Sequence, residues 1–484
     1  MLFNSLSFAL FLVAVYCLFL VIPSRFKKLF LIGASYLFYG FASYRAGAVL
    51  AVVSLLCYWG GHLIRKTEAR PRQQLFCLFS LLAFLTLTLT YFKYVTFVAE
   101  QLHQFAAGLK SGRPDFFLFF VPVGISYYIF QGIGYLVDVY WGKAKEERLE
   151  NFLLFMAFFP KVMMGPIERG EKLLPQIEQL GSFRFDYDRF REGLLLFFWG
   201  LFKKLVVAER LALYVNDIYR SPADNPGIPV MTAMLCFTFQ LYSDFSGYTD
   251  MALGVGKLFG LELTQNFNRP FYATNIQDFW RRWHISFSSW IGDYIFMPLR
   301  MGLRSFGKAG LVVALLITFL LVGVWHGTGW TFVIFGVLQG IYMVASTFTL
   351  RERDSYWEKQ GQSGRFWHVC FRRLVTFGMV TLSLVFFRAV SAADAFAIIK
   401  NLAWNGNFQV GLQSLWGRSD LKIAIAMVVF MEITETFLRP GPTPFARLLA
   451  RPLWQRWAAY IMVLLAILCC GVFTNPQRFI YFAF

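Results

Sequence analysis

Long apolar runs separated by short polar stretches follow one another along the whole chain. A helix of about 20 apolar residues crosses roughly 30 Å of hydrocarbon at 1.5 Å per residue. Runs of this kind predict spanning helices that begin near residues 5, 29, 46, 73, 116, 193, 230, 309, 330, 374, 421 and 457. The pattern predicts an all-α polytopic membrane protein with about 10 to 12 transmembrane helices.

One apolar run is too long for a single crossing. Residues 309–350 contain no Asp, Glu, Lys or Arg, and as a helix they would extend about 63 Å. We therefore expect two spans with a hinge at the tetrapeptide HGTG, residues 326–329. A shorter segment, residues 151–164, runs into FPKVMMGPIERG, whose lysine and Gly-Pro pair predict a broken or re-entrant helix.

The loop charges predict the orientation of the spans. Basic residues follow the first expected span at 25–28 and the third at 65–72, which places the N-terminus outside the cytoplasm under the positive-inside rule. Residues 262–308 and 351–373 each hold six Lys or Arg and three Asp or Glu. Both loops are expected in the cytoplasm, so His326 between them lies toward the outer side.

Composition supports a membrane protein and excludes a nucleic-acid binder. The 484 residues are 57% hydrophobic and 15% charged, with a formal net charge of +18. In a soluble protein that charge would suggest nucleic acid as a partner, but here it falls in loops between apolar runs. No repeat or linker is apparent, so we expect one integral membrane domain over 1–484, with N-terminal spans at 1–142, a catalytic core at 143–350 and C-terminal spans at 351–484.

His326 is the strongest single candidate for chemistry. The chain has five histidines but no H-E-x-x-H motif, no pair at i, i+4 and no G-x-S-x-G elbow, so neither a metal site nor a serine hydrolase is expected. An ionisable group inside an uncharged double span is a functional-site hypothesis by default. The alternative is an interfacial aromatic belt, marked by Trp325 and Trp330, with a hydrogen-bonded structural histidine.

A second cluster occupies residues 265–299 and combines charged, amide and aromatic side chains. Arg281 and Arg282 could hold a phosphate-bearing donor, while Trp280 and Trp283 could stack on an adenine or line an acyl tunnel. The alternative is a membrane-surface helix with arginines on anionic lipid. The other polar members of the cluster are Asn266, Asn268, Arg269, Asp278 and His284.

Two acidic residues, Asp244 and Asp250, interrupt an apolar stretch at 240–260. Asp244 could orient a catalytic histidine or pair with an arginine. A structural ion pair inside the bundle is the favoured interpretation, because a lone buried carboxylate is costly.

Eight segments, in this order along nearly the whole chain, carry a family resemblance: ASYLFYG (34–40), VPVGISYYIFQGIGYLVDVYWG (121–142), FFPKVMMGPIERG (158–170), QLYSDFSGYTDMALG (240–254), NFNRPFYATNIQDFWRRWHISFSSWIGDYIFMPL (266–299), GVWHGTGWTFVIFG (323–336), VFFRA (385–389) and FIYFAF (479–484). Together they resemble the membrane-bound O-acyltransferase (MBOAT) family, in particular its bacterial branch with the alginate O-acetylase membrane subunit and the teichoic acid D-alanyl transfer protein. Two departures, RMGLRSFGK after Leu299 and Ala483 in place of a common Gln, leave the acceptor open.

The resemblance implies a fold and a set of site residues. The fold would be a ring of membrane helices with re-entrant segments around a thin centre, where an outer funnel and an inner tunnel meet near the catalytic histidine. The family's near-invariant histidine falls on His326 and its second functional histidine on His284. From the side chains of the 265–299 cluster we expect Trp280, Arg281, Arg282, Trp283, Asn266 and Asn268 on the donor side, with Asp244, Asp278 and Trp325 in support.

The implied function is acyl transfer across the bacterial cytoplasmic (inner) membrane. The donor substrate would be a cytoplasmic thioester, acetyl-CoA or an acyl-carrier protein, with no bound cofactor and no metal. The acceptor would be an exported or surface polysaccharide, reached through an extracytoplasmic esterase-like partner protein. His326 would act as general base, or through a covalent acyl-histidine. The alternatives are D-alanyl transfer to teichoic acid, O-acylation of a lipid, and a non-enzymatic polysaccharide or lipid transporter.

Overall fold

A computed structural model describes residues 1–106, 121–145, 147–362, 364–402, 413, 415, 417–437, 445–473 and 479–480, and their side chains apart from those of 95–106. All regular elements in these ranges are helices, in agreement with the expected all-α class. The expected span start near residue 116 and residues 481–484 of the terminal motif lie outside the described residues. The chain divides into two compact units.

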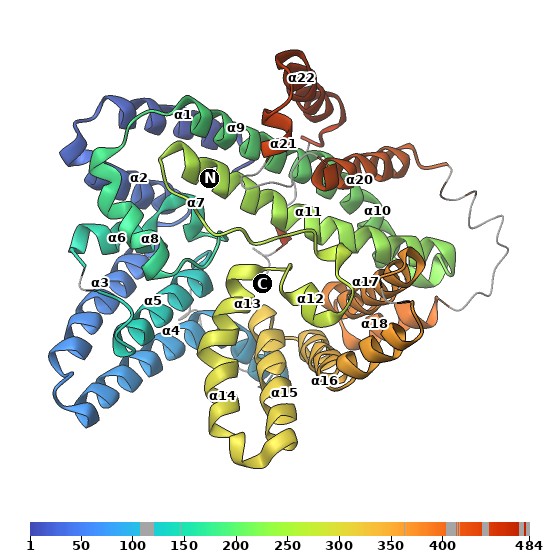
Figure 1. The fold of residues 1–484 in the computed structure, drawn as a ribbon, viewed down its shortest axis with the longest axis horizontal. Coiled ribbons are helices and arrows are strands. Elements are labelled where there is room, and N and C mark those ends of the chain that lie inside the picture. The colour runs from blue at the N-terminus through green and yellow to red at the C-terminus, as the bar shows by residue number, and fades with distance from the viewer. Residues whose placement is uncertain are drawn as a thin grey trace. The chain divides into compact units, whose positions relative to one another are not determined.

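The first unit comprises residues 1–197 and 251–264. Its helices are α1 Leu6–Val21, α2 Lys27–Gly40, α3 Tyr44–Lys66, α4 Pro71–Ala106, α5 Ile125–Tyr140, α6 Leu149–Ala157, α7 Phe159–Val162, α8 Gly170–Glu178 and the larger part of α9 Tyr187–Phe202, with 3-10 turns at Ser24–Phe26 and Gln179–Ser182. Within this unit α3 packs on α4 and α5, and α2 packs on α3 and α6 (Figure 1).

The predicted broken helix is confirmed in this unit. Helices α6 and α7 meet at Phe158, whose φ of −47° and ψ of 113° lie outside the helical region. The freed backbone amide of Phe159 donates to Ser35 Oγ at 3.1 Å. Lys161, only 2% exposed, donates from Nζ to Gln131 Oε1 at 2.5 Å. Side chains from other helices therefore satisfy the polar groups that the break exposes.

The second unit comprises residues 198–250 and 265–484. Its helices are α10 Glu209–Arg220, part of α11 Ile228–Leu258, α12 Ile276–Trp280, α13 Ile285–Ile291, α14 Met297–Gly302, α15 Gly307–His326, α16 Trp330–Lys359, α17 Phe366–Arg388, α18 Ala392–Lys400, α20 Ser419–Phe437, α21 Ala446–Leu449 and α22 Leu453–Cys470, with π-helical turns at Lys203–Ala208 and Gly292–Phe296 and 3-10 turns at Pro222–Asp224, Pro270–Tyr272 and Arg304–Phe306. The expected division at residues 142 and 350 stays a prediction.

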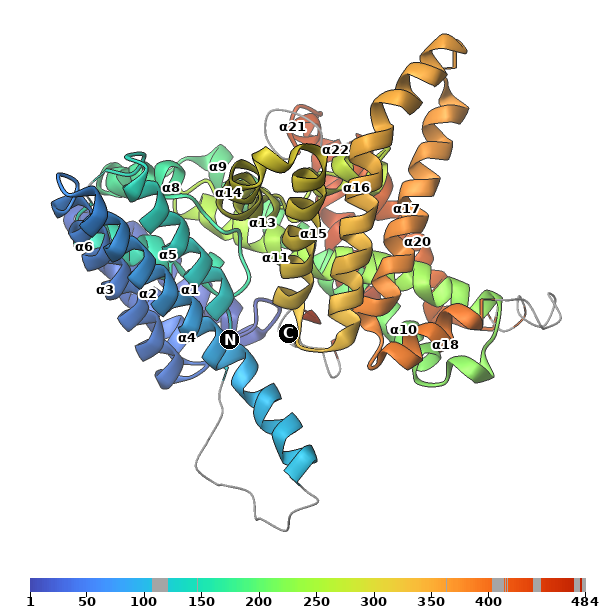
Figure 2. The same ribbon diagram turned by 90° about the horizontal axis from the view of Figure 1, so that it is seen from below.

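The long uncharged run forms the predicted helical hairpin. Helices α15 and α16 lie side by side, and α17 follows along α16 (Figure 2). Two glycines permit the close approach of α15 and α16, because a Cβ at residue 323 would lie 2.9 Å from the Cα of Gly336. Small residues at such crossings are characteristic of helix pairs in membranes. The hinge at HGTG is therefore confirmed as a turn between two helices.

Six helices within the described residues are long and apolar enough to cross a bilayer: Tyr44–Lys66, Pro71–Tyr94, Arg304–His326, Trp330–Lys359, Phe366–Arg388 and Leu453–Cys470. They coincide with six of the expected spans, and the protein is a multi-pass membrane protein. A further apolar helix, α1, is shorter. The larger count of about 10 to 12 stays a prediction.

Candidate active site

His326 stands at the tip of the α15–α16 hairpin. It is the last residue of α15 and is 4% exposed. Gly327 follows in an extended conformation, and α16 begins at Trp330. A Cβ at residue 327 would lie 2.9 Å from Cζ of Phe332 and would overlap two more atoms of that ring. Only glycine lets the turn close against the ring, so the sequence at the hinge fixes where the histidine sits.

Aromatic rings surround the His326 imidazole. Its centroid lies 4.6 Å from the ring of Trp325, 5.0 Å from that of Phe387, 5.9 Å from that of Phe335 and 6.3 Å from that of Phe287. These side chains come from α13, α15, α16 and α17. The enclosure is apolar, so a hydrogen bond or proton transfer at the imidazole is little screened by water.

His284 is held in a strained turn immediately before α13. Its φ of 46° and ψ of 54° are left-handed, a conformation that costs a non-glycine residue about 1–3 kcal/mol. The buried side chain of Asn266 stabilises the turn, because its Oδ1 accepts from the amide of Ser286 at 3.1 Å while its carbonyl oxygen accepts from Ile285 at 2.9 Å. Asn266 is therefore a positioning residue for His284.

The two candidate histidines share two aromatic neighbours. The His284 ring lies 5.0 Å from Phe287 and 6.2 Å from Trp325, and these two rings stack on each other at 4.2 Å. Phe245 also contacts His284 at 4.7 Å. Burial lowers the pKa of His284 to about 3. The neutral imidazole is a weak base at physiological pH and is better suited to hydrogen bonding than to taking up a proton.

A cavity of about 590 Å³ reaches this aromatic group from one side. Phe287 lines the cavity and also contacts both histidines, so its ring separates the cavity from the imidazoles. Two exposed arginines, Arg281 and Arg300, also line this cavity. The volume is in the range of sites that enclose a small organic molecule. An extended ligand with an anionic end would fit this combination of apolar wall and cationic residues.

A hydrogen-bonded chain fixes one wall of the cavity. Trp280 lines it and donates from Nε1 to Gln339 Oε1 at 3.1 Å. Gln339 in turn donates to Ser383 Oγ at 2.7 Å. The indole is thereby tied to α16 and α17, which lets it act as a rigid surface for a ligand.

Other members of the predicted donor side are used within the protein. Arg282 donates to Asp278 at 2.8 Å and accepts at its carbonyl oxygen from the amide of Asn268 at 3.0 Å. Trp283 is buried and stacks on Phe279 at 5.5 Å. Of the six donor-side residues expected from the sequence, Trp280 and Arg281 line the 590 Å³ cavity. The donor-side role stays a prediction for all six.

Asp244 belongs to a buried ion-pair network, as the favoured interpretation expects. Its Oδ1 accepts from Lys204 Nζ at 2.7 Å, and the same ammonium lies 2.7 Å from Glu209. Its Oδ2 accepts from the backbone amide of Ile480 at 2.7 Å. The partner of Asp244 is thus a lysine rather than an arginine, and the carboxylate also anchors the described part of the chain's C-terminal segment.

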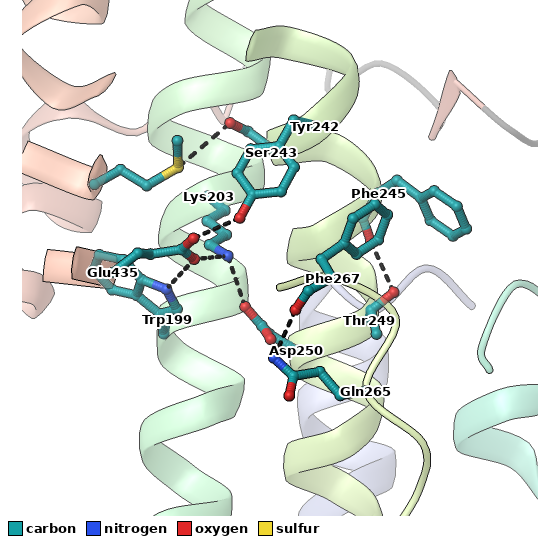
Figure 3. Close-up of polar contacts among 11 residues, drawn as sticks. Trp199, Lys203, Tyr242, Ser243, Phe245, Thr249, Asp250, Gln265, Phe267 and Glu435 are labelled. Atoms are coloured by element: carbon teal, nitrogen blue, oxygen red, sulfur yellow. Dashed lines mark hydrogen bonds and ion pairs between the residues drawn. The ribbon is translucent and has the colours of Figure 1, made fainter. Parts of the chain in front are cut away.

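The adjacent lysine forms a second ion-pair group (Figure 3). Lys203 pairs with Asp250 at 2.9 Å and with Glu435 from α20. Glu435 also accepts from the Trp199 indole at 3.4 Å and from the Tyr242 hydroxyl. All three ionised side chains are at most 3% exposed, so the attraction among them must offset a large loss of hydration.

The sequence contained one signal for this network that our interpretation did not use. Two adjacent lysines, Lys203 and Lys204, interrupt the apolar stretch FFWGLFKKLVVAER, and charges inside a span are functional or paired. The π-helical turn over residues 203–208 widens the helix at that point. No group of three or more His, Cys, Asp or Glu side chains arranged to hold a metal is found in the part of the chain that the structure describes.

Comparison with known proteins places these residues in a wider context. The profile of the membrane-bound O-acyltransferase family, MBOAT, matches residues 148–391. A peptidoglycan O-acetyltransferase of Helicobacter pylori is 32% identical over 406 residues, which cover 78% of this chain and 74% of that protein. A probable alginate O-acetylase, AlgI, of Pseudomonas putida is 32% identical over 456 residues, 92% of this chain and 90% of the relative. A teichoic acid D-alanyltransferase of Bacillus subtilis is 31% identical over 272 residues, 55% of this chain and 68% of the relative.

Proposed function

Because this chain belongs to the membrane-bound O-acyltransferase family, and is therefore an O-acyltransferase, we propose that it passes an acetyl group from a cytoplasmic thioester to a polysaccharide outside the cytoplasm. The donor is acetyl-CoA or an acyl-carrier protein. The acceptor is an exported or cell-surface polymer, in line with relatives named for peptidoglycan and alginate O-acetylation. The site of action is the inner membrane of a bacterium.

The observation that carries this proposal is the position of His326 beyond the wall of the 590 Å³ cavity. The imidazole takes the proton of the acceptor hydroxyl as its oxygen attacks the thioester carbonyl. The carbon–sulfur bond then breaks, and the imidazolium returns the proton to the leaving thiolate.

The donor enters from the cavity side. The thioester arm extends along Trp280 toward Phe287, and the guanidinium of Arg281 holds phosphate groups of the donor through charge-assisted hydrogen bonds. His284 shapes the inner end of this path through its contact with Phe287. The surrounding architecture is the family's ring of about 10 to 12 helices with an outer funnel and an inner tunnel. In this route the hydroxyl that attacks the thioester belongs to an extracytoplasmic esterase-like partner, which receives the acyl group and completes its transfer to the polymer.

D-alanyl transfer to teichoic acid is the second candidate. The similarity to the Bacillus subtilis D-alanyltransferase supports it. That similarity covers 55% of this chain, whereas the similarity to the alginate-type relative covers 92%, so D-alanyl transfer ranks second. Lipid O-acylation is a third candidate within the same fold. Membership of an enzyme family argues against a non-enzymatic transporter.

Mass spectrometry of surface polymers from cells with and without this protein tests the proposal. Loss of O-acetyl groups from a polysaccharide in the deletion strain, restored by the wild-type chain, is the expected result. Loss of ester-linked D-alanine from teichoic acid would support the second candidate instead. Unchanged polymers together with altered lipid acylation would support the third.

Arg281→Ala is expected to weaken use of the donor. Removing a charge-assisted hydrogen bond to a phosphate raises the apparent KM for the thioester about tenfold, with a smaller change in kcat. Steady-state kinetics with acetyl-CoA in proteoliposomes measures this. The matched control is Arg304→Ala, an exposed arginine of the same unit that does not line the cavity. Equal KM values for both variants would contradict the donor role.

Phe287→Ala is expected to relax the limit on acyl-chain length. The wild-type ring closes the cavity toward the histidines, and each buried methylene contributes about 0.8 kcal/mol. Removing the ring should raise the ratio of butyryl to acetyl transfer about tenfold or more, measured by competition between the two thioesters. Phe296→Ala enlarges the same cavity elsewhere and is the control. A similar ratio in both variants would argue against Phe287 as the length limit.

A further inference from the structure

A second, smaller cavity lies between α16 and α17. Its volume is about 160 Å³, and the loop at residues 274–276 closes one side. Ser346, Arg353 and Trp357 reach it from one face of α16, since positions seven and eleven residues apart are stacked on a helix. His368 and Met379, eleven residues apart on α17, form the opposite wall. The cavity therefore follows two facing helical stripes and is separate from the proposed acyl-transfer site.

Two polar side chains in this cavity lack a hydrogen-bond partner in the described part of the chain. His368 is 9% exposed, with Nδ1 and Nε2 both buried and unsatisfied, and the buried Oγ of Ser346 is also unsatisfied. A buried donor left without a partner costs about 1–3 kcal/mol. Ser346 lies eleven residues, or about 16 Å of helix, from Trp357, which contacts His368. An elongated ligand that presents separate acceptor oxygens at these two levels would remove that cost.

The charge at this end of the cavity is positive. Arg372 is engaged with Asp354, its guanidinium lying 2.8 Å from the carboxylate. Arg353 lines the cavity and is exposed. No ion pair is found for it within the described residues, so its charge is not neutralised there. The His368 ring lies 4.6 Å from Trp357, which fixes the imidazole beside the arginine-bearing wall. The set of donors matches a phosphate or another oxyanion.

The lining changes from polar to apolar along the cavity. Arg353 lies near the C-terminal end of α16 and His368 in the first turn of α17, whereas Tyr342 and Met379 belong to the apolar parts of the two spans. On the same first turns of α17, large apolar side chains are exposed: Phe366 70%, Trp367 80%, Phe371 60% and Leu374 68%. Exposed aromatic side chains at the end of a span are typical of headgroup depth in a bilayer.

We infer that this cavity binds the headgroup phosphate of an anionic phospholipid, with an acyl chain continuing along the apolar parts of α16 and α17. Basic pockets between spans are a known way to hold such headgroups. The volume is below the roughly 300–1,000 Å³ of sites that enclose a whole drug-sized molecule, so a ligand with its bulk outside the cavity fits better than a nucleotide. The loop charge expected for residues 351–373 places the site on the cytoplasmic leaflet.

Native mass spectrometry of the full chain in detergent tests this inference, with dioleoyl phosphatidylglycerol and dioleoyl phosphatidylcholine as competing probes. The wild-type protein should retain phosphatidylglycerol about fivefold to tenfold more than phosphatidylcholine, the effect of one or two basic contacts. Arg353→Gln and His368→Phe should each reduce this preference toward equality. The phenyl ring keeps the contact with Trp357 while removing both nitrogens.

Arg351→Gln is the matched control, because this arginine is exposed on the same helix but does not line the cavity. It should keep the wild-type preference. Loss of the preference in Arg351→Gln to the same degree would show general surface charge and overturn the site. Displacement of the lipid by millimolar glycerol 3-phosphate would identify a soluble phosphate ligand and overturn the lipid assignment. Ser346→Ala, a smaller change, should weaken retention without altering size-exclusion behaviour, which separates binding from folding.

Discussion

His326→Ala is expected to lower the rate of acyl transfer by about 100- to 10,000-fold, the usual contribution of a general base. Without the imidazole, no described side chain at the hairpin tip is placed to take the acceptor proton beside the cavity wall formed by Phe287. The measurement is O-acetyl content of the surface polymer in cells that produce the variant at the wild-type level in the membrane. Transfer from acetyl-CoA in proteoliposomes gives the rate directly.

Two further variants separate chemistry from folding in this experiment. Thr328→Ala lies in the same turn and is half-buried, so it perturbs the hinge while leaving the imidazole in place and should keep most of the activity. His326→Gln keeps a polar side chain of similar size but cannot cycle a proton. Retention of acylation by both His326 variants would remove the histidine from the mechanism.

The hinge around His326 could be predicted because a single physical rule determines it. A charge-free run of 42 residues exceeds one bilayer crossing, and the HGTG tetrapeptide near its middle is the natural hinge. A lysine and a Gly-Pro pair after a short apolar segment likewise predicted a broken helix near residues 158–170, and the structure places the break at Phe158. Local sequence determines both features, so neither needed knowledge of distant contacts.

The lining of the cavity could not be predicted in the same way. Arg281 and Arg282 are adjacent in the sequence, yet one lines the cavity and the other pairs with Asp278. The difference arises in the turn after α12, which ends at Trp280 and brings Arg282 rather than Arg281 to the Asp278 carboxylate. Phe287 gave no sequence signal, since a phenylalanine in an apolar segment is usually core packing. Its position between cavity and imidazoles depends on how α13 meets the hairpin.

The partners in the ion-pair network also could not be predicted from the sequence, because they lie far apart along the chain. Asp250 and Glu435 lie 185 positions apart, and only the fold brings both carboxylates to one ammonium. A pair of lysines in an apolar run predicts buried partners, but it does not identify them. Glu435 could be identified as a partner only from the structure, which places α20 beside the π-helical turn.

Lys203→Met is expected to destabilise the protein by about 3–5 kcal/mol, the usual effect of leaving buried charges without their partner. Lys203 is the ammonium shared by Asp250 and Glu435, and all three side chains are at most 3% exposed. Its removal leaves two buried carboxylates that repel each other and can be neutralised only by taking up protons. Thermal unfolding of the purified protein in detergent, followed by intrinsic fluorescence, measures the loss.

The origin of the effect can be separated from lost packing by a second substitution. Lys203→Met/Glu435→Gln removes one of the stranded charges, so it should recover part of the Tm. The amide oxygen can still accept from the Trp199 indole, and the amide NH2 can donate to the Tyr242 hydroxyl oxygen. Lys308→Met, at an exposed lysine of the same unit, should leave the Tm nearly unchanged because exposed charges contribute little. A double variant less stable than Lys203→Met would instead mean that Glu435 stabilises the fold through its hydrogen bonds rather than through the shared ammonium.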